Sequence, residues 1–310
     1  MISSSDSSDD SLEDFDDNED ENSLFSDNFT AINRRRDILW KEKNINIPKN
    51  YLKFNGKSTL ASHILALNSP YQCLSYFLND NFLDLVVLES TKYAAIKNIN
   101  KPIKISKMEL RKFIGINILM SIVQLPSIRD YWKDVIGNDL IKKTMTITKF
   151  ESIRSILHFN DNNNSIAKGQ PGYNRLIKVA SIVKHFQDRF RTIPKEECLS
   201  IDEQICSTKA RIHLKQYMPM KPHKWGFKFF ILCGVSGFAY DFELYSGQEN
   251  DSEKRPATEP DLGASSNIVV RLSRTIPINQ NFKLYFDNYY TSINLLIYLA
   301  KKGIRNLLYI

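Results

Sequence analysis

Two stretches of sequence, Cys198-Leu199-Ser200-Ile201-Asp202-Glu203 and Phe282-Lys283-Leu284-Tyr285-Phe286-Asp287-Asn288, decide the fold of this chain. Each is a short apolar run, typical of a β-strand, that ends in a carboxylate. Two such strands side by side would hold Asp202 and Asp287 close enough to share divalent cations, which activate water and phosphate in nucleases and strand-transfer enzymes. Asp202 and Asp287 are therefore the candidate catalytic residues and the candidate metal ligands.

A structural role for the same two residues stays open. An Asp at a strand end often caps a turn, and Asp287-Asn288 has the chemistry of a turn. Glu203 follows Asp202 directly, so the alternation of side chains along a strand predicts that it points to the opposite face. We therefore expect Glu203 to lie outside the site.

The composition indicates a globular protein with two subdomains. The chain has 310 residues, of which 42% are hydrophobic, and this is enough to bury a sizeable core. The longest apolar stretch, residues 113–125, is short and interrupted, which predicts a buried helix and no membrane partner. The four cysteines form no CxxC pair, so they suggest a reducing compartment and predict no zinc site.

Charge divides the chain into an acidic beginning and a basic body. Residues 1–27 contain eleven of the 35 acidic residues and neither Lys nor Arg. The remaining 24 acidic residues stand against 42 basic ones, a net charge of +18. A body this basic favours a polyanion such as DNA, although a solvated lysine-rich surface would give the same count. We expect residues 1–30 to form a disordered acidic tail and residues 31–70 a linker.

Residues 71–195 are predicted to be helical. Apolar spacing indicates helices over residues 77–92, 110–123 and 174–191. Ser106 and Glu109 have the spacing of a capping box, and Thr148 and Glu151 repeat it.

After Pro194 the apolar period becomes that of strands. Strands are predicted over residues 197–202, 225–235, 239–245 and 282–287, and helices over residues 264–273 and 292–302. The fold class is therefore α+β. The order strand, strand, strand, helix, strand, helix matches the first half and more of an RNase H-like domain, which we place at residues 196–310.

Several longer strings resemble the piggyBac transposases and the domesticated proteins derived from them. The strings in the second half are LSIDEQ at 199–204, HLKQYMP at 213–219, KPHKWGFK at 221–228 and YFDNYYTS at 285–292. Those upstream are FIG at 113–115, LPSIRDYW at 125–132 and LHFNDN at 157–162. They follow the family order over about residues 70–305, so the resemblance covers most of the chain.

The resemblance implies a fold and a chemistry. The fold is a helical dimerisation and DNA-binding region followed by an RNase H-like catalytic domain. The activity is Mg²⁺-dependent cut-and-paste DNA transposition at TTAA targets, with Asp202 and Asp287 as the first two catalytic aspartates and metal ligands. The implied partners are DNA and a second copy of the chain, and the implied location is the nucleus.

The sequence departs from the family pattern after the second aspartate motif. The family's third catalytic aspartate and its cysteine-rich zinc module lie further on, and this sequence ends before them. Residues 306–310 also differ from the basic strand that the resemblance implies, so we expect an incomplete RNase H-like domain whose sheet stops at the strand 282–287. At the turn 208–211, Ala210 stands where a glycine is usual and loses access to positive φ.

Five basic residues surround two aromatic residues between the two aspartate motifs. This interleaving suits phosphate contact and base stacking, and the basic residues are Arg211, Lys215, Lys221, Lys224 and Lys228. We expect some of them to contact DNA, and we expect Tyr217 and Trp225 to belong to the core.

The sequence therefore predicts a piggyBac-derived, truncated DNA-binding protein without strand-transfer activity, which leaves its status as an enzyme open. One alternative is an active Mg²⁺-dependent DNA transposase or nuclease. The other is a non-enzymatic interaction protein or a decaying copy of the element.

Overall fold

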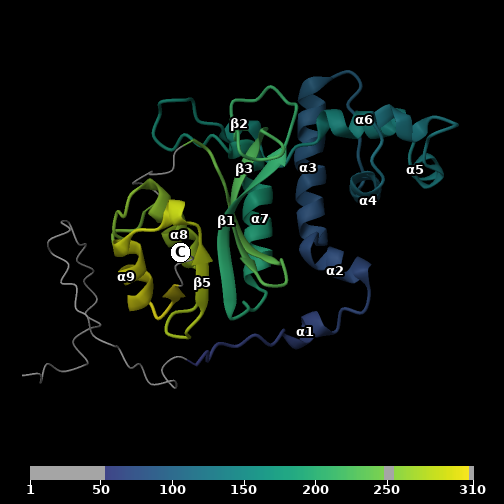
Figure 1. Ribbon diagram of the computed structural model, residues 1–310. Helices are drawn as coiled ribbons and strands as arrows, with labels where there is room; N and C mark the ends of the chain where they lie inside the picture. Colours follow the sequence, from purple (N-terminus) through teal and green to yellow (C-terminus); the bar gives the residue numbers. More distant parts are fainter. Residues whose placement is uncertain (1–52, 248–254, 307–310) are drawn as a thin grey trace, which may run out of the picture.

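The computed structural model describes residues 53–247 and 255–306, so the predicted acidic tail lies outside the described residues. Figure 1 shows a mixed α/β protein in which helices form the first half of the chain and a sheet with further helices forms the second half. None of the helices in the described ranges combines the length and the apolar character needed to cross a bilayer.

The first half consists of short and medium helices joined by loops. In chain order they are α1 (Ser62–Leu65), α2 (Pro70–Phe77), α3 (Asp80–Lys97), α4 (Lys107–Ile122), the 3₁₀ helix η4 (Ile128–Trp132), α5 (Asp139–Thr144), α6 (Ile147–Ile156), the 3₁₀ helices η5 (Asn162–Asn164) and η6 (Ile177–Val179), and α7 (Ala180–Arg191).

The start of α4 confirms the predicted capping box. The Ser106 hydroxyl accepts a hydrogen bond from the Glu109 backbone N–H, and the Glu109 carboxylate accepts one from the Ser106 N–H. The repeated spacing at Thr148 was a wrong prediction, because α6 begins earlier and its N-cap is Thr146, whose hydroxyl accepts from the Lys149 N–H. Capping at Thr146 satisfies an orphan N–H of the first turn and so sets where the helix begins.

The predicted helix over residues 174–191 is also shorter than expected, because α7 begins at Ala180. The Asn174 side chain accepts a hydrogen bond from the Leu176 N–H, and 3₁₀ geometry follows at η6. A short polar side chain that binds its own backbone competes with the α-helix, so the apolar period alone placed the start too early.

The helices pack around their own hydrophobic core. Phe150 from α6, Leu110 and Phe113 from α4, and Leu83 from α3 are among its buried members. Tyr131 is buried there, and Trp132 packs against the same cluster while its indole N–H donates to the Met145 carbonyl. This core is built without residues from the sheet.

The second half contains the sheet and the helices that cover it. In chain order its elements are β1 (Cys198–Ser207), β2 (Gln216–Tyr217), β3 (Trp225–Gly234), β4 (Ala239–Leu244), α8 (Ala264–Ser273), β5 (Lys283–Phe286), the 3₁₀ helix η8 (Asn288–Tyr290), α9 (Ile293–Lys301) and β6 (Arg305–Asn306).

The sheet is mixed, with strand order β2-β3-β1-β5-β6 and β4 paired to β3. The β3 strand pairs antiparallel with β1, β2 and β4. The β5 strand pairs parallel with β1 and with β6. The expectation that the sheet stops at β5 is therefore wrong. The Arg305 N–H donates to the Phe282 carbonyl, and the short strand β6 continues the sheet beyond β5.

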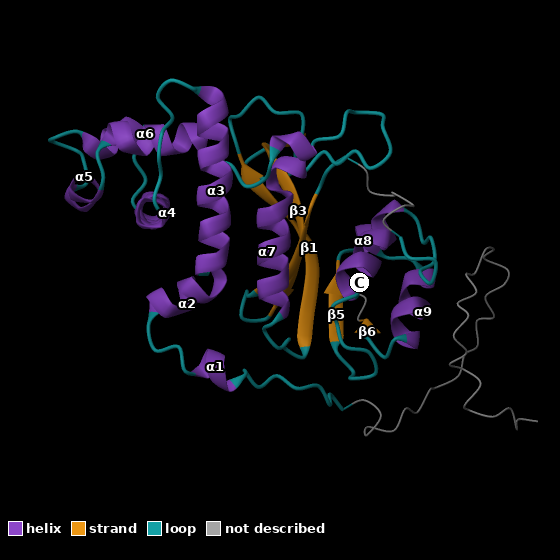
Figure 2. Ribbon diagram, turned by 180° about the vertical axis from the view of Figure 1, so that it is seen from behind, coloured by secondary structure: helices purple, strands orange, loops and turns teal. Residues whose placement is uncertain are grey.

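One face of the sheet is sealed by α8 and α9, which Figure 2 shows beside β5. The second hydrophobic core of the protein lies on this face. It includes Leu199 from β1, Phe230 from β3 and Leu284 from β5, together with Ile268 and Leu295 from the two helices. On the other side α7 lies against β4, where Phe190 packs against Phe242 and Gln187 donates to the Phe242 carbonyl. The Arg191 guanidinium adds an ion pair with the buried Asp241 carboxylate, so α7 joins the helical half to the sheet.

Candidate metal and DNA site

The parallel pairing of β1 with β5 places the two candidate aspartates beside each other. Ile201 pairs with Phe286 in this register, and Asp202 and Asp287 are the next residues of the two chains. Neighbouring strands lie about 4.8 Å apart, so the two residues follow at adjacent positions on one end of the parallel pair. This adjacency joins residues that lie far apart in the sequence.

Asp202 does not end its strand, which corrects the strand predicted over residues 197–202. The β1 strand continues to Ser207, because β3 pairs with it as far as Ser207 opposite Gly226. Gly226 permits this pairing because any Cβ there would collide with the Cys206 carbonyl and the Ile205 side chain. The aspartate is therefore held inside a paired strand, in a more rigid position than a strand end.

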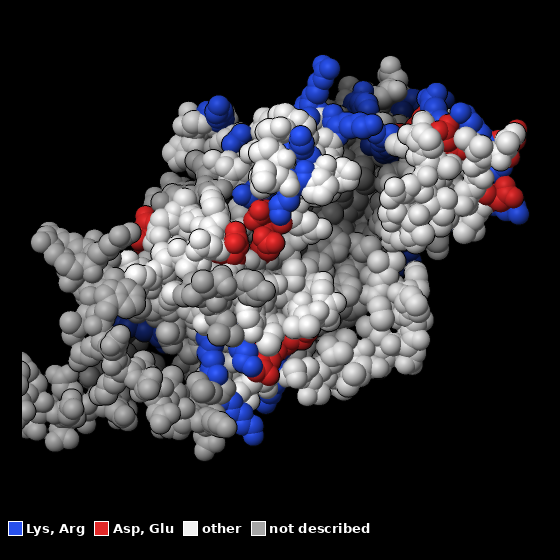
Figure 3. All heavy atoms as spheres, in the orientation of Figure 1, with Lys and Arg blue, Asp and Glu red and all other residues white. Residues whose placement is uncertain are grey.

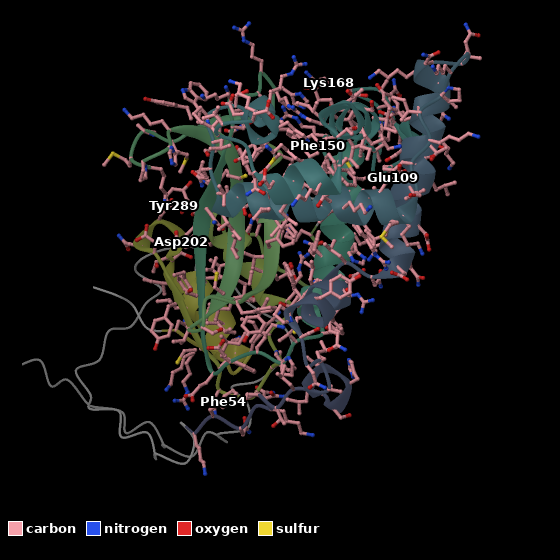
Figure 4. The ribbon with its side chains drawn as sticks, turned by 90° about the vertical axis from the view of Figure 1, so that its right-hand side faces the viewer. Phe54, Glu109, Phe150, Lys168, Asp202 and Tyr289 are labelled. Carbon is pink, nitrogen blue, oxygen red and sulfur yellow. The ribbon has the colours of Figure 1, made fainter. Side chains whose placement is uncertain are left out.

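Asp202 lies on the open face of β1, and Asp287 is exposed just after β5. The Asp287 carboxylate accepts a hydrogen bond from the Asn288 N–H and caps η8. The turn-capping role that the sequence left open is thus present, and it leaves further lone pairs of this carboxylate available. Figure 4 shows Asp202 and Tyr289 on the same side of the molecule, away from Glu109 of the helical half.

Glu203 lies on the opposite face of β1 from Asp202, as the alternation of the strand predicted. Its carboxylate accepts a hydrogen bond from the Tyr290 hydroxyl at 2.9 Å and lies 3.4 Å from the Lys221 ammonium. Its backbone N–H donates to the Asp202 carboxylate at 2.7 Å, and the two carboxyl groups also interact. The Glu203 side chain thus points to the other face of the strand, and its carboxylate contacts Tyr290 and Lys221 there.

The pKa values of the neighbouring Asp202 and Glu203 carboxyl groups are shifted in opposite directions. Burial raises the pKa of Asp202, and the interaction with the Glu203 carboxyl raises it further. Burial also opposes ionisation of Glu203, but hydrogen bonds from Tyr290 and Asp202 and the charge of Lys221 lower the pKa of Glu203 overall. A cation bound at Asp202 would favour the ionised form of this carboxyl group.

The donor set suits one hard cation. Asp202 and Asp287 can each offer carboxylate oxygens, and water can complete the octahedron that Mg²⁺ requires. Within residues 53–247 and 255–306, no group of three or more His, Cys, Asp or Glu side chains is arranged to hold a metal ion. Asp202 and Asp287 therefore form a candidate pair of ligands, without a third such side chain grouped with them in the part of the chain that the structure describes.

The five candidate DNA-binding residues fall into different environments. Figure 3 shows basic side chains along the upper part of one surface of the molecule and a group of acidic ones near its middle. Arg211 and Lys224 are exposed, Lys215 lies over the Trp225 ring, and Lys221 pairs with Glu203. Lys228 lies over the rings of Phe230 and Tyr245, so it points to the sealed side of the sheet.

The prediction that Tyr217 and Trp225 belong to the core is wrong. Tyr217 is 49% exposed and Trp225 is 51% exposed. They face each other at the short pairing of β2 with β3, with ring centroids 4.8 Å apart. The apolar pattern of a strand does not specify which of its residues a neighbouring element covers.

An apolar cavity of about 740 Å³ lies between α7 and strands β3 and β4. Phe186 of α7, Phe229 of β3 and Leu244 of β4 are among its lining residues, and Arg175 and Arg211 also border it. Sequence reasoning missed it because it depends on how two distant elements pack, although the helical spacing of Phe186 and the alternation of Phe229 each marked an apolar face.

Comparisons with known proteins agree with this architecture. A family model described as "Transposase IS4" matches residues 69–307. Human PiggyBac transposable element-derived protein 3 is 27% identical over 243 residues, which are 76% of this chain and 39% of that protein. Human PiggyBac transposable element-derived protein 2 is 27% identical over 242 residues and is likewise covered over 39% of its length. This chain therefore spans about two fifths of the length of these relatives.

A solved structure is similar in fold. It is titled as a cryo-EM structure of the piggyBac transposase synaptic complex with hairpin DNA, and it matches with a TM-score of 0.63 at 18% identity. The match covers 79% of this chain and 52% of that chain. With the family model and both relatives in agreement over most of its length, the chain belongs to the family of piggyBac-type transposases and the proteins derived from them.

Proposed function

We propose that this chain is a piggyBac transposase-derived DNA-binding protein that holds a divalent cation between Asp202 and Asp287. The observation that carries the proposal is the parallel β1–β5 register, by which Asp202 and Asp287 follow paired residues at adjacent positions, and both are exposed. A strand pair of this kind in a transposase-family chain is suited to bringing a cation to a phosphate.

The strand arrangement supports an RNase H-like domain over residues 196–310. Antiparallel β4, β3 and β1 are followed by parallel β5 and β6, with α8 and α9 in the connections. This order agrees with the order expected of that domain, in which Asp202 lies on the first strand and Asp287 directly follows the fourth, β5. Residues 71–195, with a core of their own, would serve dimerisation and DNA binding.

The charge of the chain supports DNA as the partner. The solved relative is titled as a complex with hairpin DNA, and the chain beyond residue 27 carries a large excess of basic residues. Exposed cations near the carboxylates would contact phosphates and release counterions. A DNA-binding role would place the protein in the nucleus.

The site would hold its cation through the carboxylates of Asp202 and Asp287. A bound Mg²⁺ would polarise a phosphate oxygen and stabilise charge that develops on it. Glu203 would hold Lys221 and Tyr290 near the end of β5, so that Asp287 keeps its place beside Asp202. Because the described residues supply no third carboxylate to this site, we expect the 310-residue polypeptide by itself to bind DNA without strand transfer.

Two measurements test the proposal. The first is fluorescence anisotropy of a labelled TTAA-containing duplex at 50 and 200 mM salt, where phosphate contacts predict affinity that falls steeply with salt. The second is calorimetric titration with Mn²⁺, which should show one site in the wild type and its loss in Asp202→Asn and Asp287→Asn. Asp188→Asn is the matched control, since this exposed aspartate pairs with Lys184 on α7, the helix that packs against β4.

Absence of duplex binding at 50 mM salt would overturn the DNA-binding role. Cation binding that survives in both aspartate variants would overturn the proposed metal site. A Mg²⁺-dependent nick or hairpin at TTAA ends that disappears in Asp202→Ala would show that the polypeptide is an active transposase and would overturn the expected lack of strand transfer.

A further inference from the structure

We propose that Tyr217 and Trp225 form a stacking platform for unpaired DNA bases, set apart from the carboxylate pair on the same face of the sheet. The inference deepens the proposed DNA binding and rests on it. It concerns a subsite that would hold single-stranded DNA, whereas the proposed function concerns affinity for DNA in general.

The two rings are held in place yet open to solvent. Tyr217 and Trp225 pair across β2 and β3, and their rings are tilted by 45° with centroids 4.8 Å apart. About half of each side chain is exposed. Large aromatic residues that remain half exposed next to each other are typical of binding surfaces.

Cations surround this platform. The Lys215 ammonium lies 5.0 Å from the centre of the Trp225 ring, and Lys224, the residue before Trp225, is exposed. Exposed Met220, on the loop that joins β2 to β3, adds an apolar side chain. Aromatic faces bordered by lysines are the pattern by which proteins bind single strands, where bases stack on rings while the cations contact phosphates.

The platform and the carboxylates share one face of the sheet. Asp202 pairs with Ile231, and Trp225 lies six residues before Ile231 on β3, so side-chain alternation puts both on the same side. Six residues of strand span roughly 20 Å. Stacked nucleotides advance about 3.4 Å along one strand, so the platform lies roughly six nucleotides from a phosphate at the carboxylates.

This geometry favours unpaired bases over duplex DNA. A duplex hides the faces of its bases inside the stack, whereas unpaired bases can place a face on an aromatic ring. An apolar protein partner would leave the charges of Lys215 and Lys224 without a complement, so the charge around the rings favours a nucleic-acid strand.

The test compares three labelled substrates by anisotropy: a blunt duplex, the same duplex with a six-nucleotide single-stranded overhang, and that overhang built from abasic sites. We expect the wild type to bind the overhang substrate about tenfold more tightly than the other two. Trp225→Ala should lose this preference while binding the blunt duplex as the wild type does, and Trp225→Phe should restore most of it. Lys224→Ala should weaken the blunt and overhang complexes by a similar factor.

A second readout is independent of affinity. The fluorescence of 2-aminopurine placed in the overhang should be quenched by the wild type and by Trp225→Phe, and left unquenched by Trp225→Ala, as expected if the base stacks on the ring. Circular dichroism melting verifies that each variant is folded. An abasic overhang that binds as tightly as a normal one, or equal losses for all three substrates in Trp225→Ala, would overturn the platform while duplex binding, and with it the proposed function, still stands.

Discussion

The two faces of strand β1 differ sharply, although their residues alternate in one short sequence. Leu199 and Ile201 are 0% and 1% exposed under α8 and α9. Ser200, Asp202 and Gln204, which alternate with them, are exposed on the other face. One strand therefore anchors the sheet with every second residue and offers the intervening ones to the site.

The difference continues across the sheet. The face that carries Leu284 and Phe230 is sealed by helices, whereas the other face is covered by α7 at β4 and remains open at Asp202 and Asp287. A sealed face makes the positions of the backbone rigid, and an open one admits a ligand. The sealed face should therefore control stability, and the open face should control binding.

The largest effect on stability should come from truncating a buried side chain on the sealed face. Ile201→Ala removes a fully buried side chain and should lower the free energy of unfolding by about 2–5 kcal/mol. Ser200→Ala, its neighbour on the open face, should change it by less than about 0.5 kcal/mol. Urea unfolding followed by circular dichroism measures both, and similar losses in the two variants would remove the distinction between the faces.

A smaller loss of stability should follow when the hydrogen bond between Tyr290 and Glu203 is removed. Tyr290→Phe removes the hydroxyl that donates to Glu203 and leaves a part-buried carboxylate with one partner fewer, at a cost of about 1–3 kcal/mol. The same change should raise the pKa of Glu203, because the Tyr290 hydroxyl helps to lower it. Tyr289→Phe is the matched control on an exposed ring; if it destabilises the protein equally, the Glu203 contact is unimportant.

Low pH should weaken the interactions of the Asp261 carboxylate at the start of α8. Hydrogen bonds from Asn267, the ion pair with Arg255 and the Gly263 N–H lower the pKa of Asp261 to about 2. Its stabilisation is therefore fully present above about pH 4, the usual range of an unfolded aspartate, and is lost as the pH falls towards 2.

Asp261→Asn should lower stability by at most about 1 kcal/mol at pH 6, since the carboxylate is partly exposed and its ion pair is screened. Melting curves between pH 6 and pH 2 should show the gap between variant and wild type closing as the pH falls. A gap that is constant over this range would contradict the role of the charge.

The smallest effect on stability is expected at the open end of β3. Trp225→Ala should change the free energy of unfolding by less than about 1 kcal/mol, because half of this side chain is already in solvent. A loss near 3 kcal/mol, typical of a buried Trp, would restore the original expectation that the ring belongs to the core.

Local signals predicted several elements correctly. The helix predicted over residues 264–273 is α8 to the residue, and the Ser106 capping box marks the start of α4. These features depend on groups within a few residues of one another, where period and capping chemistry suffice. The start of α7 was predicted too early. There two local signals conflict, because the Asn174 side chain bonds to its own backbone while the apolar period favours a helix.

The sequence by itself singled out the candidate residues: two apolar runs that end in Asp202 and Asp287, inside strings that resemble those of a transposase family. Only the tertiary structure decided that β1 and β5 run parallel with those residues at adjacent positions. The same holds for the hydrogen bond of Tyr290 with Glu203, 87 residues apart in the sequence, and for the half-exposed position of Trp225. The physical reason is that contact and burial depend on which distant segments pack together, and alternation along a strand does not specify the partner that covers it.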